Sequence, residues 1–266
     1  MLDNNSCQGY HLLMLDIQVI DDPAAATVAL EPVRSRLLSE LAAPASAATL
    51  ATRVGLARQK VNYHLHTLEA HYAQIESELN YSPPDPIGVI LYTQQGFADI
   101  TQAPGWVGAL NDGRIRVPVQ GLTGMDSELS RVLKHELTHS FIQQKTHGRA
   151  PTWIQEGVAQ WMEGKRSDEN AAVLVQVYDQ GQAAPLGNLE GSWMGLPGDI
   201  AHYAYAWALA NTEYIVETDG MGDIERILDR LAAGSSTERA LKEVLHDDYG
   251  DLMRSCAEYL KKNYGK

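Results

Sequence analysis

Apolar residues recur at helical spacing along the stretch LSRVLKHELTHSFIQ, residues 129–143. The positions that carry this pattern are Leu129, Val132, Leu133, Leu137 and Phe141. Their spacing predicts one amphipathic helix over the whole stretch. The polar pair Asp126-Ser127 and the acidic Glu128 stand just before it, as is typical of a helix start.

A second helix is predicted over residues 150–164, APTWIQEGVAQWMEG. Its dense apolar positions indicate a mostly buried helix, and Pro151 stands near its start, where proline is favoured. Glu156 falls in the middle of these apolar positions. Because burying a lone carboxylate is costly, we expect Glu156 to be paired or to bind a metal ion.

The first helix carries the pattern H-E-x-x-H at His135, Glu136 and His139. Residues four apart lie on the same helix face, so both imidazoles can point at one metal ion. Glu136 stands beside them, where a carboxylate can take a proton from a water on that metal. Glu156 comes 17 residues after His139, enough for a turn and an antiparallel return. It would be the third protein ligand, with water in the fourth position, as in catalytic zinc sites.

These two motifs together resemble the gluzincin clan of zinc metallopeptidases. The second motif, WIQEGVA at residues 153–159, is similar to the W-x-x-E-G-x-A helix of the bacterial peptidase MA-like group. The metzincin pattern does not fit, because Ile142 and Lys145 stand where it needs Gly and His. The resemblance covers about residues 70–263.

The resemblance implies an α+β fold: a thermolysin-like metallopeptidase domain, mostly helical with a small mixed sheet. It implies one Zn²⁺ per chain, held by His135, His139 and Glu156, with Glu136 as general base in the hydrolysis of peptide bonds. Tyr203 stands where related peptidases carry a tyrosine that donates to the oxyanion, and Tyr205 and His202 compete for that role. The partner would be a peptide or protein substrate.

Other patterns fill in the rest of this domain. Residues 87–92, IGVILY, predict a strand, and residues 114–119, RIRVPV, alternate like an edge strand, which Pro118 also fits. In gluzincins such a strand pairs with an extended substrate by β-augmentation. Residues 165–200 are rich in glycine and predict loops. Residues 200–217 and 221–263 predict helices.

The segment before this domain has a different character. Residues 31–71 contain helical patterns around a turn at Gly55, and they resemble winged helix-turn-helix DNA-binding domains of the ArsR type. The resemblance would place one helix in the major groove, where its polar side chains can read bases and phosphates. The residues it would bring to DNA are Arg58, Gln59, Lys60, Asn62, Tyr63 and His64.

A winged helix should continue into a β-hairpin wing after residue 70, but here the helix pattern continues to Glu76. Residues 31–71 carry five basic and three acidic side chains, a surplus of +2, and the rest of the chain carries −15. A surplus of two is small for DNA binding, since each phosphate contact needs its own donor. The other interpretation is therefore a helical module for protein contacts.

Length, composition and charge limit the possible domain number, partners and localisation. The 266 residues, 44% of them hydrophobic, suggest one large or two small globular domains. A net charge of −13 argues against nucleic-acid or membrane binding through the overall field. Two cysteines make no disulfide framework, and no stretch has the length of a membrane span, so we expect a cytoplasmic protein.

The expected organisation is an unassigned segment at 1–30, a helix-turn-helix-like module at 31–71 and the peptidase domain at 72–266. Residues 11–20 are compatible with a strand or a short helix. The alternative function is a DNA-binding transcriptional regulator whose zinc site is non-catalytic or sensory. An open fourth metal position would favour catalysis, and a closed one a structural role.

Overall fold

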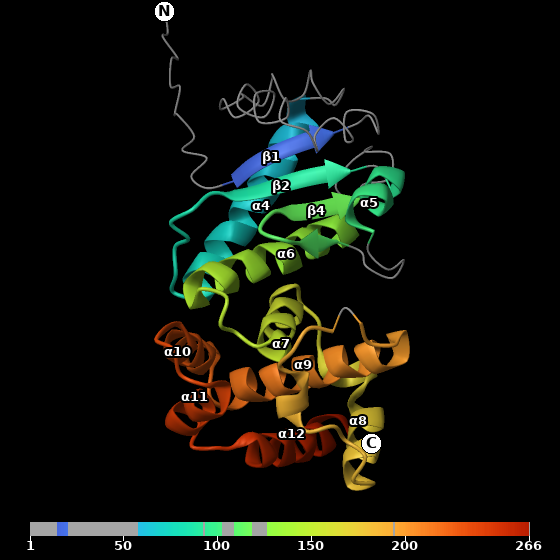
Figure 1. Ribbon diagram of the computed structural model, residues 1–266, viewed down its shortest axis with the longest axis vertical. Helices are drawn as coiled ribbons and strands as arrows, with labels where there is room; N and C mark the ends of the chain where they lie inside the picture. Colours follow the sequence, from blue (N-terminus) through green and yellow to red (C-terminus); the bar gives the residue numbers. More distant parts are fainter. Residues whose placement is uncertain are drawn as a thin grey trace, which may run out of the picture.

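The computed structural model describes residues 15–20, 58–92, 94–102, 109–118, 127–193 and 195–265. One half of the molecule contains a small sheet with helices α4 and α6, and the other half contains helices α7 to α12 (Figure 1). The predicted α+β class, mostly helical with a small mixed sheet, is confirmed. The helix-turn-helix pattern at residues 31–57 lies outside the described residues.

The sheet has four strands in the order β1-β2-β4-β3. Their bounds are β1 Leu15–Ile20, β2 Ile87–Tyr92, β3 Leu110–Asn111 and β4 Ile115–Pro118. Strands β1 and β4 run parallel to β2, and β3 runs antiparallel to β4. The strand predicted at 87–92 is confirmed at both ends.

The prediction that residues 114–119 form an edge strand was wrong. Strand β4 lies between β2 and β3, and the two-residue β3 forms the edge. A tight turn at Asp112–Arg114 folds the chain back, so β3 covers Ile115 and Arg116. Pro118 lies beyond this pairing, where its missing N–H removes no bond to β3.

Strand β1 resolves the open interpretation of residues 11–20 in favour of a strand. It pairs with β2 from Leu15 opposite Ile87 to Ile20 opposite Tyr92. Parallel neighbours need a long crossover, and the crossover here contains α4. Part of the segment left unassigned by the sequence is thus a strand of the sheet.

Helix α4 spans Arg58–Glu78, and the predicted continuation of the helix beyond residue 70 is confirmed. Its inner face buries Leu68 and Ile75, and Leu79 directly after its end is also buried. It packs along α6, Ser127–Thr146, where the rings of Tyr72 and Phe141 meet edge to face with centroids 4.8 Å apart. Helix α6 in turn contacts β3 and β4.

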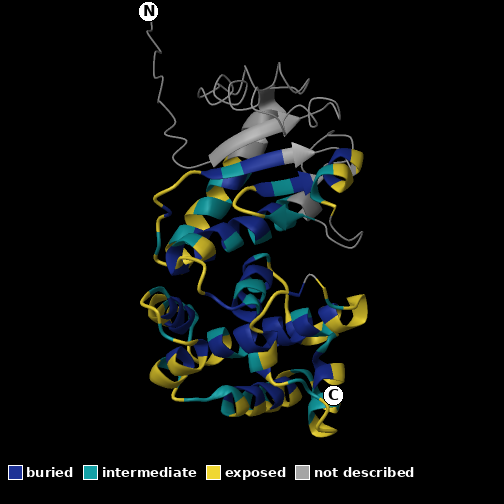
Figure 2. Cartoon of the chain, viewed as in Figure 1, coloured by how far each residue is buried: buried dark blue, intermediate teal, exposed yellow. Residues whose placement is uncertain are grey.

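The second half of the molecule is helical. Its elements are α7 Thr152–Met162, α8 Ala171–Asp179, α9 Gly198–Thr218, α10 Met221–Ala232, α11 Thr237–Val244 and α12 Tyr249–Tyr264. Helix α7 contacts both α6 and α9 and so connects the two halves. Buried residues gather in these helices (Figure 2). The fully buried Trp153 and Trp207 are among them.

Residues 165–200 were predicted to be loops, but they contain α8. Its buried Ala171 and Leu174 belong to the main core, and the helix packs against α12. A helix of nine residues is marginal in isolation, so this tertiary contact decides its conformation. The other described residues of the stretch are irregular apart from the short 3₁₀ helices Ser167–Glu169 and Leu186–Leu189 and the start of α9.

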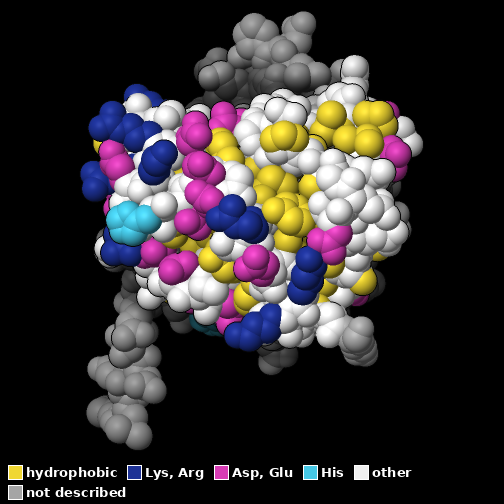
Figure 3. Space-filling view, turned by 90° about the horizontal axis from the view of Figure 1, so that it is seen from below, with side chains coloured by type: hydrophobic (Ala, Val, Ile, Leu, Met, Phe, Trp, Pro, Cys, Tyr) yellow, Lys and Arg dark blue, Asp and Glu magenta, His cyan; other side chains and the backbone are white. Residues whose placement is uncertain are grey.

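Charges on the face seen from below are mixed. Acidic and basic side chains alternate there, with apolar side chains between them (Figure 3). Ion pairs on the helical half, such as Lys261 with Asp179 and Arg254 with Asp251, agree with this mixture. Among the described helices, none is both long and apolar enough to cross a membrane.

Candidate metal centre

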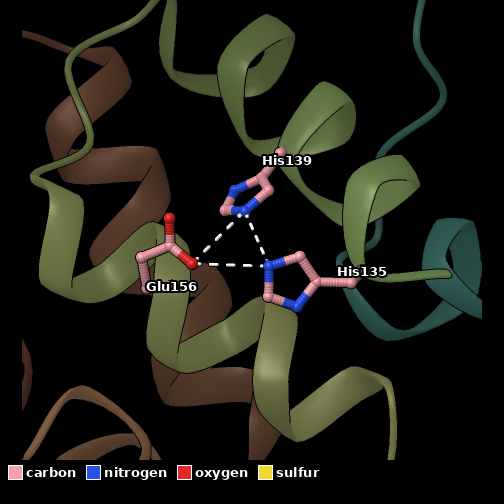
Figure 4. A group of neighbouring side chains, drawn as sticks. All are labelled: His135, His139 and Glu156. Atoms are coloured by element: carbon pink, nitrogen blue, oxygen red, sulfur yellow. Dashed lines mark hydrogen bonds and ion pairs between the residues drawn. The ribbon is translucent and has the colours of Figure 1, made fainter. Parts of the chain in front are cut away.

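Three side chains from two helices converge at the junction between α6 and α7 (Figure 4). His135 and His139 come from the same face of α6, and their Nε2 atoms lie 3.1 Å apart. Glu156 comes from α7, and its Oε2 lies 3.4 Å from Nε2 of His135 and 3.5 Å from Nε2 of His139. The three ligand atoms therefore form a nearly equilateral triangle.

This triangle has the size that a tetrahedral zinc ion requires. Zinc binds histidine nitrogen and carboxylate oxygen at about 2.0–2.1 Å, which puts neighbouring ligand atoms about 3.3 Å apart. The observed separations of 3.1, 3.4 and 3.5 Å bracket that value. Oε2 of Glu156 is buried and accepts no hydrogen bond, so a metal ion would satisfy it. Within the described ranges, no other set of three such side chains meets in this way.

The turn between the two helices brings Glu156 to the histidines. Helix α6 ends at Thr146, and His147 and Gly148 then adopt left-handed conformations with φ of 53° and 73°. The N–H of Gly148 donates to the carbonyl of Gln143 at 3.0 Å and closes the helix end. Such a cap reverses the chain, and glycine adopts its conformation without steric cost.

Gly157 lets α9 approach α7 directly behind the site. A Cβ at this position would lie 2.4 Å from the carbonyl oxygen of Ala208 and 2.2 Å from Oγ1 of Thr212. The helices can cross this closely only because residue 157 has no side chain. The glycine that follows Glu156 in the sequence motif thus has a packing role.

Burial and mutual charge set the protonation of the site in the metal-free protein. Burial lowers the pKa of His135, but contacts with the carboxylates of Glu156 and Glu163 outweigh it and raise the pKa to about 10. Burial alone would raise the pKa of Glu156, yet the histidines hold it well below its usual value. A carboxylate that stays ionised suits the binding of a cation.

Glu136 lies beside the ligands and is 7% exposed. Burial raises the pKa of its carboxyl group, the two histidines oppose this, and the charges of Glu156 and Glu163 add to it. A raised pKa makes a carboxylate a better proton acceptor near neutral pH. Its backbone carbonyl accepts a hydrogen bond from Nδ2 of Asn111 in β3, at 3.0 Å.

A cleft of about 1180 Å³ opens in front of these groups. Its walls are β3, the middle of α6 and α7, the 163–170 loop and the start of α9. His135, Glu136, His139 and Glu156 all line it. The side of the triangle that faces the cleft is thus accessible to a further ligand.

The structure separates the three residues that compete for the oxyanion role. Tyr203 does not line the cleft; its ring packs edge to face on Trp207, and its hydroxyl is buried. Tyr205 and His202 do line the cleft. Burial raises the pKa of Tyr205, and the charges of Glu156 and Glu136 raise it further, which places its hydroxyl in the field of the site.

The residues predicted to contact DNA are only partly described. Arg58, Gln59, Lys60, Asn62 and Tyr63 all lie in the first turns of α4. Their side chains, and that of His64, fall outside the described part of the chain. Among the described residues that line the cleft, none belongs to α4.

A fold with a small mixed sheet, an H-E-x-x-H helix and a second helix that delivers a glutamate defines a metallopeptidase-like domain. The family model of the Peptidase MA superfamily matches residues 73–262, and the chain belongs to this superfamily. A helix-turn-helix domain model matches residues 29–71. No curated protein and no solved structure matches the chain.

Proposed function

We propose that the protein is a zinc-dependent metallopeptidase. The observation that carries the proposal is the triangle of His135, His139 and Glu156, which opens on a cleft directly beside Glu136. A structural zinc site is closed by four protein ligands, whereas a catalytic site keeps one position open. Three protein ligands beside an ionisable carboxylate therefore favour hydrolysis over a purely structural or sensory site.

A zinc ion in this triangle would polarise a peptide carbonyl and lower the pKa of a water molecule. Glu136 would accept a proton from the attacking water and pass it to the leaving amine. Tyr205, rather than Tyr203, donates to the oxygen on which negative charge develops. Residues two apart on a helix are rotated by about 200° around the helix axis and so lie on nearly opposite faces. Only one of these two tyrosines can therefore face the cleft.

The substrate would lie along β3. This edge strand, with Ala109, Leu110 and Asn111, lines the cleft and has no further strand on its outer side in the described sheet. An extended peptide can add to such an edge through backbone hydrogen bonds. The binding role predicted for residues 114–119 thus moves to the neighbouring strand.

The proposal is tested by metal content together with cleavage of an unbiased peptide library, with wild type beside Glu136→Gln. We expect one zinc per chain in both proteins and cleavage by the wild type alone, because glutamine cannot accept the proton. Cleavage by both proteins would remove Glu136 from the mechanism. Zinc in both proteins without any cleavage would favour the alternative function, a DNA-binding transcriptional regulator with a non-catalytic zinc site.

A second function, DNA binding, is favoured by the helix-turn-helix match at residues 29–71. The matched segment lies in the chain between β1 and β2, so we propose a module inserted into the peptidase domain. Arg58→Ala with Lys60→Ala should weaken binding to a DNA library in a gel-shift assay and lower its salt dependence. Binding unaffected by the substitutions and by salt would favour a module for protein contacts. Both activities would take place in the cytoplasm.

A further inference from the structure

Beside the ligand triangle lies a further carboxylate, Glu163, that the sequence motifs do not mark. We propose that Glu163, held in place by Lys165, is a positioning residue that orients His135 for the metal ion. The inference rests on the proposed zinc site and concerns a residue that lines the cleft but is not one of the three ligand side chains.

The contact involves the ring nitrogen that faces away from the triangle. Oε1 of Glu163 lies 3.3 Å from Nδ1 of His135, while Nε2 of the same ring lies 3.4 Å from Glu156. The imidazole is therefore held between two carboxylates. An acceptor at Nδ1 keeps the proton on that nitrogen and leaves Nε2 free to bind a metal, and it also fixes the ring plane.

The position of Glu163 follows from helix geometry. It is the C-cap of α7 and stands seven residues after Glu156, close to two full helical turns. Its N–H donates to the carbonyl of Ala159 at 3.0 Å, which fixes the backbone there. One face of α7 thus supplies both a metal ligand and the support for a ligand on α6.

Lys165 completes the arrangement. Its Nζ lies 2.9 Å from Oε1 of Glu163, the same oxygen that faces His135. The Glu163 side chain is only 4% exposed, whereas that of Lys165 is 47% exposed. An exposed lysine contributes little to stability by itself, but its charge helps to keep a buried carboxylate ionised. Burial raises the pKa of Glu163, and contacts with His135 and Lys165 bring it below its usual value.

The two histidines differ in this respect. Among the described residues, His139 has no carboxylate within ion-pair distance other than Glu156. His135 has both Glu156 and Glu163. If Glu163 only formed a helix end tied to Lys165, its removal would leave the zinc affinity unchanged. If it orients His135, its removal lowers the zinc affinity.

The experiment compares zinc affinity, measured by competition with a chelator, and the visible spectrum of the cobalt-substituted protein. The variants are Glu163→Ala, Glu163→Gln and Glu163→Asp. We expect Glu163→Ala to weaken zinc binding 10–100-fold and to alter the cobalt spectrum, because loss of an outer partner of a metal ligand has effects of this order. Glu163→Gln keeps an acceptor, and Glu163→Asp keeps the charge, so both should lose less zinc affinity than Glu163→Ala.

Glu213→Gln is the matched control. This buried carboxylate accepts from the N–H of Ser167 at 2.7 Å and so secures the same loop without contacting either histidine. We expect its zinc affinity and cobalt spectrum to equal those of the wild type. An equal loss in Glu213→Gln and Glu163→Ala would overturn the inference, because loop order rather than histidine orientation would then be the cause.

The outcomes separate this inference from the proposed function. If the wild type binds zinc and Glu163→Ala binds it equally tightly with an unchanged spectrum, the inference is wrong and the zinc site stands. If the wild type binds no zinc, both fail. Should Glu163→Ala not fold, the same comparison is made with Glu163→Gln, which preserves the size of the side chain.

Discussion

The side-chain amide of Asn111 is bonded to the backbone of Glu136. Its Nδ2 donates to the Glu136 carbonyl at 3.0 Å and also lies 2.7 Å from Oγ of Ser140. The edge strand β3 is thereby tied to the helix that carries the H-E-x-x-H motif. A substrate strand added to β3 would be placed in a fixed position relative to the metal ligands.

Removing this tie should affect both stability and turnover. We expect Asn111→Ala to lower the free energy of unfolding by about 1–3 kcal/mol, since two partly buried partners lose a hydrogen bond. Asn111→Asp should lower stability and turnover further, because a carboxylate has no proton to donate and would face the Glu136 carbonyl. Thermal unfolding and kcat/KM are the measurements. An Asp variant as stable and active as the wild type would contradict this role.

Gly157→Ala tests the helix crossing behind the site. The added methyl group would overlap the backbone of Ala208, which cannot move aside as a side chain can. Overpacking of a core costs about 1–3 kcal/mol. We expect Gly157→Ala to lower the free energy of unfolding by the upper end of this range or more, and to reduce zinc affinity. Gly222→Ala in α10 is the control, because a Cβ there meets nothing within 4 Å. Equal stability of the two variants would rule out the close crossing.

Replacing the tyrosines one at a time assigns the oxyanion donor. Tyr205→Phe should lower kcat by about 10²–10³-fold with zinc affinity unchanged, as removal of such a donor does. Tyr203→Phe should retain activity within a few-fold, because its hydroxyl is buried away from the cleft. Steady-state kinetics on one cleaved peptide decides between them. A large loss in Tyr203→Phe alone would restore the original assignment.

Glu156→Ala should weaken zinc binding by more than about 100-fold, since even outer partners of ligands are worth 10–100-fold. Glu136→Gln, which alters the neighbouring carboxylate without removing a ligand, should keep its zinc. The measurement is metal content after dialysis against a weak chelator. Equal zinc content in Glu156→Ala and wild type would exclude Glu156 as a ligand.

The metal-free protein should lose stability as the pH rises from 6.5 to 10. The pKa of His135 is raised from 6.5 to about 10, so the folded state holds a proton that the unfolded state has released. The resulting stabilisation is fully present below pH 6.5 and disappears as the pH approaches 10. Thermal unfolding with a chelator present measures it, and His135→Gln should abolish this part of the pH dependence.

Zinc should reverse that trend. Zinc binds the neutral imidazole, so it must displace the proton of His135, and its apparent affinity should increase over the same pH range. Proton release on zinc addition at neutral pH, measured by calorimetry in buffers of different ionisation enthalpy, checks this directly. Zinc binding without proton release would contradict the protonation state assigned to His135.

Much of the architecture was predictable from the sequence, because it depends on short-range periodicity. The apolar spacing in residues 129–143 fixed a helix that runs over Ser127–Thr146, and helix geometry alone puts His135 and His139 on one face. The same holds for α7, α9 and β2. The acid in an apolar helix was a sufficient signal to single out Glu156.

Only the tertiary structure decided the rest. Which strand forms the edge, where β1 pairs and whether residues 171–179 are helical all depend on contacts between distant segments. Tyr203 and Tyr205 are indistinguishable by pattern, because each lies in an apolar, aromatic helix, and the packing of α9 alone selects the one that faces the cleft. Glu163 gave no signal of its own, since its role arises from an imidazole that α6 brings to the end of α7.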